Sequence, residues 1–303
     1  MFMNKIIIAF VAVASLGLAS CSFNKAGANS DSSNPLDLFG NFIMASDHYV
    51  SRNIPLEDFK SIETYGSFNV EYRHGNQSRA ELYMPDNVIK YLDIEVKAGK
   101  LKLGLKNNTI VKWRNDNKPK IIVYAPSVNE LSIQGSGTLV SKEPLQGERV
   151  SLSLSGSGDL LVESLKASSA NVEIEGSGDV GVLSMDVAEN AELSMTGSGD
   201  LNVKSLKANN AIMNLTGSGD FRVVALSAKA LSASLTGSGE MWLRGTADKV
   251  SYALDGSGEL KAGRLKVRDM DARVSGSGEI TCYATGKTNF KASMLSSIHN
   301  LAH

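Results

Sequence analysis

The chain has 303 residues, with 31 basic and 32 acidic side chains and a formal net charge of −1. Because no basic excess exists to attract phosphate groups, the composition argues against a nucleic-acid-binding protein. Hydrophobic residues make up 42% and charged residues 21% of the chain, which is ordinary for a folded protein. The function therefore has to be sought in motifs and repeats.

The first twenty residues predict a signal peptide rather than part of the fold. Lys5 supplies a positive charge, residues 6–13 form an apolar run, and small residues lead to Cys21. Such a run is too short to span a bilayer and is typical of a secretory signal. Leu18-Ala19-Ser20-Cys21 resembles the bacterial lipoprotein signal, which implies cleavage before Cys21 and lipidation of its thiol with chains such as palmitate. The alternative is an ordinary signal peptide that happens to precede a cysteine.

The lipoprotein prediction places the mature protein on the bacterial envelope, with the outer membrane as the expected location. Acyl chains contribute about 0.8 kcal/mol per buried CH₂, so several chains hold a folded domain on a membrane. Cys282 is the second of only two cysteines, so no intramolecular disulfide is expected if Cys21 carries lipid. Residues 21–47 are rich in small and polar side chains and are expected to be a lipidated cysteine followed by a flexible tether.

Residues 48–130 predict strands of uneven length. Apolar and polar residues alternate over 68–72, 92–96 and 101–105, which indicates strands with one buried face. Turn-forming residues separate these segments. We expect an irregular β region that caps or begins the repeat array that follows it.

Residues 131–290 contain a tripeptide, Gly-Ser-Gly, that recurs every 19 to 21 residues. A constant period of this length is the signature of a solenoid or array. Two repeats per blade would give only a four-bladed propeller, so a solenoid of eight coils is the stronger prediction. The motifs begin at Gly135, Gly156, Gly176, Gly197, Gly217, Gly237, Gly256 and Gly276.

One repeat shows how a coil is built. From Leu193 to Val203 apolar residues and glycines alternate with polar residues, so one side of the strand faces a core. The glycines of the motif are expected inside, at a sharp bend, and the serine outside. The alternation changes phase before Leu206 and again before Met213, which predicts a small three-sided coil. Successive coils are expected about 4.8 Å apart.

The repeated motif is followed by an acidic and then an apolar residue, and Phe59-Lys60-Ser61-Ile62 and Gly66-Ser67-Phe68-Asn69-Val70 precede the array. This combination, over about residues 55–290, resembles the autotransporter adhesin head GIN domain family. The resemblance implies a right-handed parallel β-helix and an envelope location, and it brings no catalytic residues. A ninth motif is missing where Leu295-Ser296-Ser297 stands, so residues 291–303 are expected to be an irregular tail.

An acidic residue follows seven of the eight motifs, and Thr138 follows the first. Stacked carboxylates about 5 Å apart repel each other by about 3 kcal/mol at an effective dielectric of 20. Two interpretations remain open: the carboxylates are solvated or accept hydrogen bonds from turn N–H groups, or neighbouring pairs bind a divalent cation such as calcium. The acidic residues are Asp159, Asp179, Asp200, Asp220, Glu240, Glu259 and Glu279.

Other residues suggest a carbohydrate ligand. Trp113 and Trp242 are candidate platforms for sugar stacking, with structural packing as the alternative. Lysines recur midway between motifs, where they keep a face solvated or bind anionic glycans. These lysines are Lys166, Lys207, Lys229, Lys249 and Lys266.

The expected function is a non-enzymatic envelope lipoprotein, an adhesin-type scaffold that presents a solenoid face to a glycan or protein partner. No cofactor is expected beyond calcium on the acidic residues. The alternatives are a polysaccharide-active β-helix enzyme and a purely structural envelope lipoprotein. An enzyme is disfavoured because the acidic residues recur at the same place in successive repeats, which is typical of a structural position. In addition, no histidine lies within residues 131–290 to activate a serine.

Overall fold

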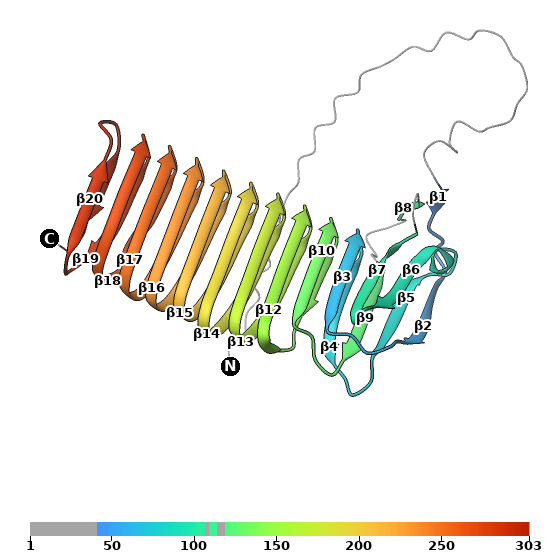
Figure 1. Ribbon diagram of the computed structural model, residues 1–303. Coiled ribbons are helices and arrows are strands. Elements are labelled where there is room, and N and C mark those ends of the chain that lie inside the picture. Colours follow the sequence, from blue (N-terminus) through green and yellow to red (C-terminus); the bar gives the residue numbers. More distant parts are fainter. Residues whose placement is uncertain (1–40, 107–108, 114–118, 303) are drawn as a thin grey trace, which may run out of the picture. The chain divides into compact units, whose positions relative to one another are not determined.

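The computed structural model describes residues 41–106, 109–113 and 119–302. The predicted signal peptide, Cys21 and most of the predicted tether lie outside these residues. The described chain is almost entirely β, with a single short 3-10 helix, η2 (Ile89–Tyr91). Stacked parallel coils form a β-solenoid of about nine turns, which confirms the predicted fold class (Figure 1).

The array consists of long strands, each of which bends around the core as one coil. Every coil pairs in parallel with the next, and equivalent residues are partners, such as Leu201 with Phe221 and Leu215 with Leu235. Chain order equals stacking order through this region (Figure 1). The strands are β10 (Glu130–Gly135), β11 (Thr138–Ser141), β12 (Leu145–Gly156), β13 (Asp159–Gly176), β14 (Asp179–Gly197), β15 (Asp200–Gly217), β16 (Asp220–Gly237), β17 (Glu240–Gly256), β18 (Glu259–Gly276) and β19 (Glu279–Ala284).

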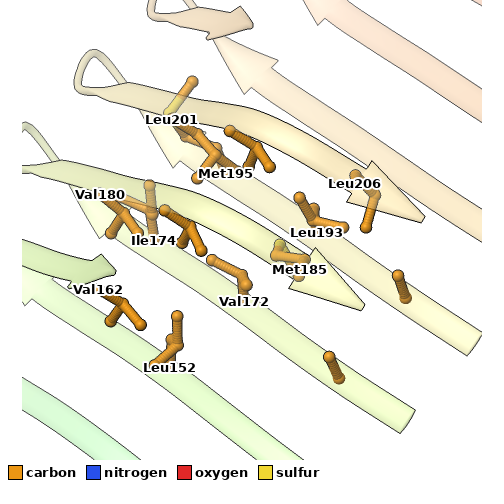
Figure 2. Close-up of a cluster of buried hydrophobic side chains, with 14 of the residues drawn as sticks. Leu152, Val162, Val172, Ile174, Val180, Met185, Leu193, Met195, Leu201 and Leu206 are labelled. Atoms are coloured by element: carbon orange, nitrogen blue, oxygen red, sulfur yellow. The ribbon is translucent and has the colours of Figure 1, made fainter. Parts of the chain in front are cut away.

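The interior is filled by rows of apolar side chains, one from each coil. Figure 2 shows Leu152, Val172 and Leu193, which are partners on consecutive coils, pointing into the same core. In β15 the predicted inward positions are buried, including Leu206 and Ala208 after the first change of phase. Each large side chain buried in this way contributes about 1.5–3 kcal/mol, so the continuous core stabilises the stack without a disulfide.

The two glycines of each motif are needed for different reasons. Gly217 has φ +131°, a region that side-chain-bearing residues rarely adopt, and a Cβ there would lie 2.1 Å from the Gly197 carbonyl oxygen. Gly219 has no such φ, but its Cβ would lie 2.1 Å from the Gly199 carbonyl oxygen. The Ser218 N–H donates to the same Gly197 oxygen at 3.0 Å, while its side chain is exposed. The motif therefore lets successive turns hydrogen-bond at close approach.

The solenoid begins before the first Gly-Ser-Gly. β3 (Ser61–Gly66) and β4 (Asn69–His74) form a coil that pairs with β10 and β11, with Gly66 opposite Gly135. Beneath it lies another coil made of β7 (Lys100–Leu105) and β9 (Lys120–Ala125), which pair in parallel with β3 and β4. In this region the stacking order differs from the chain order.

Antiparallel strands close the first coil. β6 (Leu92–Lys97) pairs with β7, while β5 (Arg79–Pro85) pairs with β9 and with β2 (Tyr49–Pro55). These pairings cover the strand edges that the first coil would otherwise expose.

The predicted tether ends earlier than expected. β1 (Asn41–Met44) pairs in parallel with β8 (Thr109–Lys112), so residues 41–44 are a strand rather than part of a tether that reaches residue 47. The reason is a small second core, in which Ile43 and Ala45 are buried against Val88.

The prediction of an irregular tail over residues 291–303 is wrong for residues 291–292 and 297–300, which lie in strands. β20 (Thr288–Ala292) pairs with β18, and β21 (Ser297–Asn300) pairs with β19, with Ile298 above Ile280. Ile298 packs against the core and takes the inward position without a Gly-Ser-Gly before it. The Asn300 amide donates to the Ala284 carbonyl at 3.0 Å and accepts from the Ala284 N–H at 2.9 Å, which completes the coil.

The structure also tests for membrane-spanning helices and shows the state of the second cysteine. Over the stretches 41–106, 109–113 and 119–302, no helix is long and apolar enough to cross a bilayer. Cys282 is fully buried with a free thiol, and burial raises its pKa to about 11. A thiol in this state is a poor nucleophile, so Cys282 behaves as a core residue.

Candidate functional site

Outward side chains form straight columns, because the coils pair in register. The residue after each motif lies in one such column, which we call the acidic ladder. It begins at Thr138, which pairs with Asn69 on one side and Asp159 on the other. Its members are Asp159, Asp179, Asp200, Asp220, Glu240, Glu259 and Glu279.

The middle of the acidic ladder carries negative charge that the nearby cations Arg222 and Lys261 compensate only in part. Partial burial, together with the charge of Asp179, raises the pKa of Asp200. Partial burial also raises the pKa of Asp220, with further contributions from Asp200 and Glu240. Backbone groups relieve the stack in part: the Asp200 N–H donates to Asp179 Oδ1 at 2.9 Å, and a hydrogen bond from the Asp220 backbone lowers the pKa of Asp200. These carboxylates therefore cost stability at neutral pH.

Glu240 and Glu259, further along the acidic ladder, share one lysine from the adjacent column. Lys261 Nζ lies 2.9 Å from Glu240 Oε2 and 2.6 Å from Glu259 Oε2. Hydrogen bonds from Lys261 and Trp242 lower the pKa of Glu240. Charge compensation thus replaces the repulsion found at Asp200 and Asp220.

The acidic ladder does not form a metal site of the usual kind. Among the described residues, no group of three or more His, Cys, Asp or Glu side chains is arranged to hold a metal ion. Calcium takes six to eight oxygen ligands, whereas each rung of the ladder offers a single carboxylate. Calcium binding by neighbouring pairs stays a prediction.

The two tryptophans lie in different surroundings. Trp242 is 39% exposed, but the Arg222 guanidinium lies 5.1 Å and the Lys261 ammonium 4.6 Å from its ring centroid. These cations come from the coils on either side, so a sugar that stacked on Trp242 would have to displace one of them. Trp113 packs edge-on against Phe68, with 6.1 Å between ring centroids, and contacts both apolar clusters. Both geometries are those of packing residues.

The motif serines and the histidines do not meet. His48 contacts Asp86 at 3.2 Å and His74 contacts the Pro126 carbonyl. His299, which lies on β21 inside the stack, approaches only Glu279, at 3.8 Å. Within the described part of the chain no motif serine has a histidine to take its proton, so the arrangement offers no activated hydroxyl nucleophile.

A groove runs along another part of the surface, at the bend about seven residues after the acidic-ladder residue of each coil. It has a volume of about 860 Å³ and is lined by the same three positions on β14, β15, β16, β17 and β18, and by Tyr283 and Thr285. We call it the corner groove. Four exposed cations line it, against two carboxylates: Lys207, Lys229, Lys266 and Arg268, and Asp186 and Asp248.

The corner groove exists because the inward residues at this corner are small. Ala208, Ala228 and Ala247 are partners on three consecutive coils, where the facing rows carry residues such as Phe221 and Met241. A small inward side chain lets the backbone approach the core, so the outer surface becomes concave. Sequence reasoning identified the lysines but missed the concavity, whose only signal was this row of alanines.

Comparisons with known proteins agree with this architecture. A family model described as "Putative auto-transporter adhesin, head GIN domain" matches residues 58–227 and 189–303. A "putative adhesin" from Parabacteroides merdae ATCC 43184 has a TM-score of 0.63 at 18% identity, covering 86% of this chain and 100% of that one. A "putative lipid binding protein" from Parabacteroides distasonis ATCC 8503 has a TM-score of 0.62 at 22% identity with the same coverage. At such identities the likeness shows the fold alone. The curated proteins contain no match.

Proposed function

Because this chain belongs to the family described as "Putative auto-transporter adhesin, head GIN domain", we propose that it is a non-enzymatic adhesin of the bacterial envelope. In this proposal the solenoid presents an extended outer face to a glycan or protein partner. Repeat proteins commonly bind through surfaces that several repeats build together.

The observation that carries the proposal is the corner groove. It is built from equivalent positions on six consecutive coils, so it offers a long surface rather than a compact pocket. An enzyme active site needs a few unique groups that converge on one reacting atom. The groove instead repeats the same positions, and the acidic ladder likewise repeats one carboxylate per coil. Both arrangements suit binding of a long partner better than catalysis.

Lipid attachment at Cys21 is the second part of the proposal. It rests on Leu18-Ala19-Ser20-Cys21, which lies outside the described residues. In this proposal the acyl chains anchor the protein in the outer membrane. The Cys21→Ala variant should then lose labelling with radioactive palmitate and leave the membrane fraction. Unchanged membrane fractionation of this variant would contradict the anchor while leaving the adhesin proposal intact.

Adhesion itself is tested with whole cells. Cells that produce the full chain should adhere to surfaces coated with envelope polysaccharide or with host glycoprotein, and cells without it should adhere less. The Cys21→Ala variant serves as the control for display, because it makes the same solenoid without the anchor. Equal adherence of producing and non-producing cells on every coating would contradict the proposal.

A further inference from the structure

We infer that the corner groove binds a linear acidic polysaccharide that lies parallel to the solenoid axis. The inference rests on the proposed binding function and goes further, because it names the site and the chemical class of the ligand. It is carried by the shape, the charge and the hydrogen-bonding groups of the groove.

The shape fits an extended polymer. The groove crosses the coils of β14 to β19, so at about 4.8 Å per coil it is about 24 Å long. Its inward row holds alanines at Ala208, Ala228 and Ala247 with a valine at each end, so no residue larger than valine occupies the row between Val187 and Val267. A folded ligand would need a deeper, closed pocket, whereas a linear chain can lie along this length.

The charge selects an anionic ligand. Lys207 and Lys266 occupy the same column three coils apart, or about 14 Å. Lys229 and Arg268 stand at equivalent positions two coils apart, or about 10 Å, on the other side of the alanine row. Cations on both sides of the row can therefore reach a chain lying between them.

The cations of the groove are free to bind a ligand. In the part of the chain that the structure describes, Lys207, Lys229 and Lys266 have no ion-pair partner, and only Arg268 pairs, with Asp269 at 3.1 Å. Lys261 in the acidic ladder, by contrast, is held by two glutamates. The groove thus keeps positive charge available along its length. Asp186 and Asp248 interrupt it at two points, which favours a ligand with spaced charges over a dense polyanion.

The remaining groups suit a sugar chain. Ser227, Thr246 and Thr285 bring hydroxyl groups, and Asn209 brings a side-chain amide. Such groups donate and accept hydrogen bonds with sugar hydroxyls. Tyr283 closes one end of the groove with a partly exposed ring, which can stack on a sugar face. A single-stranded nucleic acid would favour several aromatic platforms for its bases, and the groove has one.

The experiment measures binding of the purified full chain, in detergent micelles, to polysaccharides of defined charge. Polygalacturonate supplies carboxylates, dextran sulfate supplies sulfates, and dextran supplies the uncharged control. We expect binding to at least one acidic polymer, weakening as salt is raised, and no binding to dextran. The carboxylate and sulfate arms distinguish the two sources of negative charge.

Variants locate the site. Lys207→Glu should weaken binding about tenfold, which corresponds to about 1.4 kcal/mol. Lys204→Glu is the matched control, because Lys204 is exposed on the same coil but outside the groove and undergoes the same charge change. Thr246→Trp fills the groove without changing its charge and should abolish binding. Melting temperatures of all three variants verify that they fold.

Each remaining outcome overturns a defined part of the inference. Equal losses for Lys207→Glu and Lys204→Glu, or unchanged binding by Thr246→Trp, would remove the groove as the site. Equally tight binding of double-stranded DNA would show a general polyanion surface rather than a polysaccharide site. Cells that adhere although no acidic polymer binds would overturn the ligand class and leave the proposed adhesin function standing. Failure of both adherence and binding would remove both.

Discussion

The N-terminal region and the repeat array use the same coil in different ways. In the array each coil stacks on the one before it, so chain order and stacking order agree. In the N-terminal region β7 and β9 lie beneath β3 and β4, although they come later in the chain. The array can thus be extended by adding coils. The N-terminal region cannot be repeated in this way, because antiparallel strands occupy the edge on which another coil would stack.

The difference follows from what each region has at its edge. A coil inside the array has a parallel neighbour on both sides, so its backbone groups are paired. Among the described residues the first coil has a parallel neighbour on one side only, and antiparallel strands β5 and β6 pair with its other edge. Capping repeats of this kind protect an otherwise exposed strand edge from association with other chains.

The largest loss of stability should come from replacing a glycine of the array, compared with a glycine of the N-terminal region, which we call the cap (residues 48–130). Gly217→Ala combines an unfavourable φ with a 2.1 Å approach to backbone and should destabilise by about 2–6 kcal/mol. Gly99→Ala also meets a positive φ, +74°, but no atom lies within 4 Å, so it should cost only about 1 kcal/mol. Urea unfolding measures both, and similar midpoints would show that coil spacing is not what requires the motif.

A second pair of variants tests whether the cap is part of the same core. Leu103 on β7 and Leu215 on β15 are both fully buried, so each Leu→Ala change should cost about 2–5 kcal/mol. Circular dichroism should show one unfolding transition for both variants, shifted by similar amounts. A separate early transition for Leu103→Ala alone would mean that the N-terminal region unfolds independently of the array.

A smaller and opposite effect is expected in the acidic ladder, which is a feature of the array alone. The N-terminal region continues the same column beyond Thr138 with Asn69 and Lys120, which carry no negative charge. Replacing Asp200 and Asp220 together by Asn should therefore stabilise the fold at pH 7, by under about 1 kcal/mol, because it removes partly buried like charges. Melting temperature measures the gain.

The pH dependence of this gain has a defined sign. The folded pKa values of Asp200 and Asp220 are raised above the ordinary value of 3.8. In the pH window between the unfolded and the folded pKa, the folded state therefore binds more protons than the unfolded state. Stability of the natural protein falls as pH rises through the window, and the gain of the variant should vanish below it. Glu259→Gln, which removes a partner of Lys261, should give no gain at pH 7. Stabilisation by that control would contradict the distinction between the two parts of the ladder.

The smallest effect should be found at exposed serines of the turns. Ser218 lies in a Gly-Ser-Gly motif of the array, Ser67 follows Gly66 in the N-terminal region, and both are exposed. Their replacement by Ala should change the unfolding free energy by no more than about 0.5 kcal/mol. Urea unfolding measures both changes. A large loss of unfolding free energy for Ser218→Ala alone would show that the Ser218 hydroxyl, and not only its backbone N–H, stabilises the turn.

Most of the array could be predicted from the sequence because its pattern is local. Alternation around Met195 and Met213 identifies the buried positions, and the recurring motif fixes the register between coils. The C-terminal strands were missed because the motif was treated as necessary. Ile298 shows that an inward apolar residue at the right spacing is sufficient for one more turn.

The N-terminal order and the corner groove could not be predicted in the same way. The alternation over residues 101–105 predicts a strand but not on which side of β3 it pairs, because either position buries the same side chains. The groove depends on Ala208 and Ala228 being smaller than their neighbours, and that difference has meaning only once the coils are stacked. The sequence thus supplied the charges of the candidate site but not its shape.

The corner that forms the groove also absorbs the extra residue of β14. β14 has 19 residues where β13 and β15 have 18, and its pairing shifts register between Asp186 and Asn190, beside the groove. The glycine motifs on either side stay aligned, with Gly197 opposite Gly217. This corner therefore accommodates one more residue without disturbing the alignment of the neighbouring glycine motifs. Outward residues of this corner can be replaced with little effect on the stacking of the coils, so the same scaffold can carry grooves of different specificity.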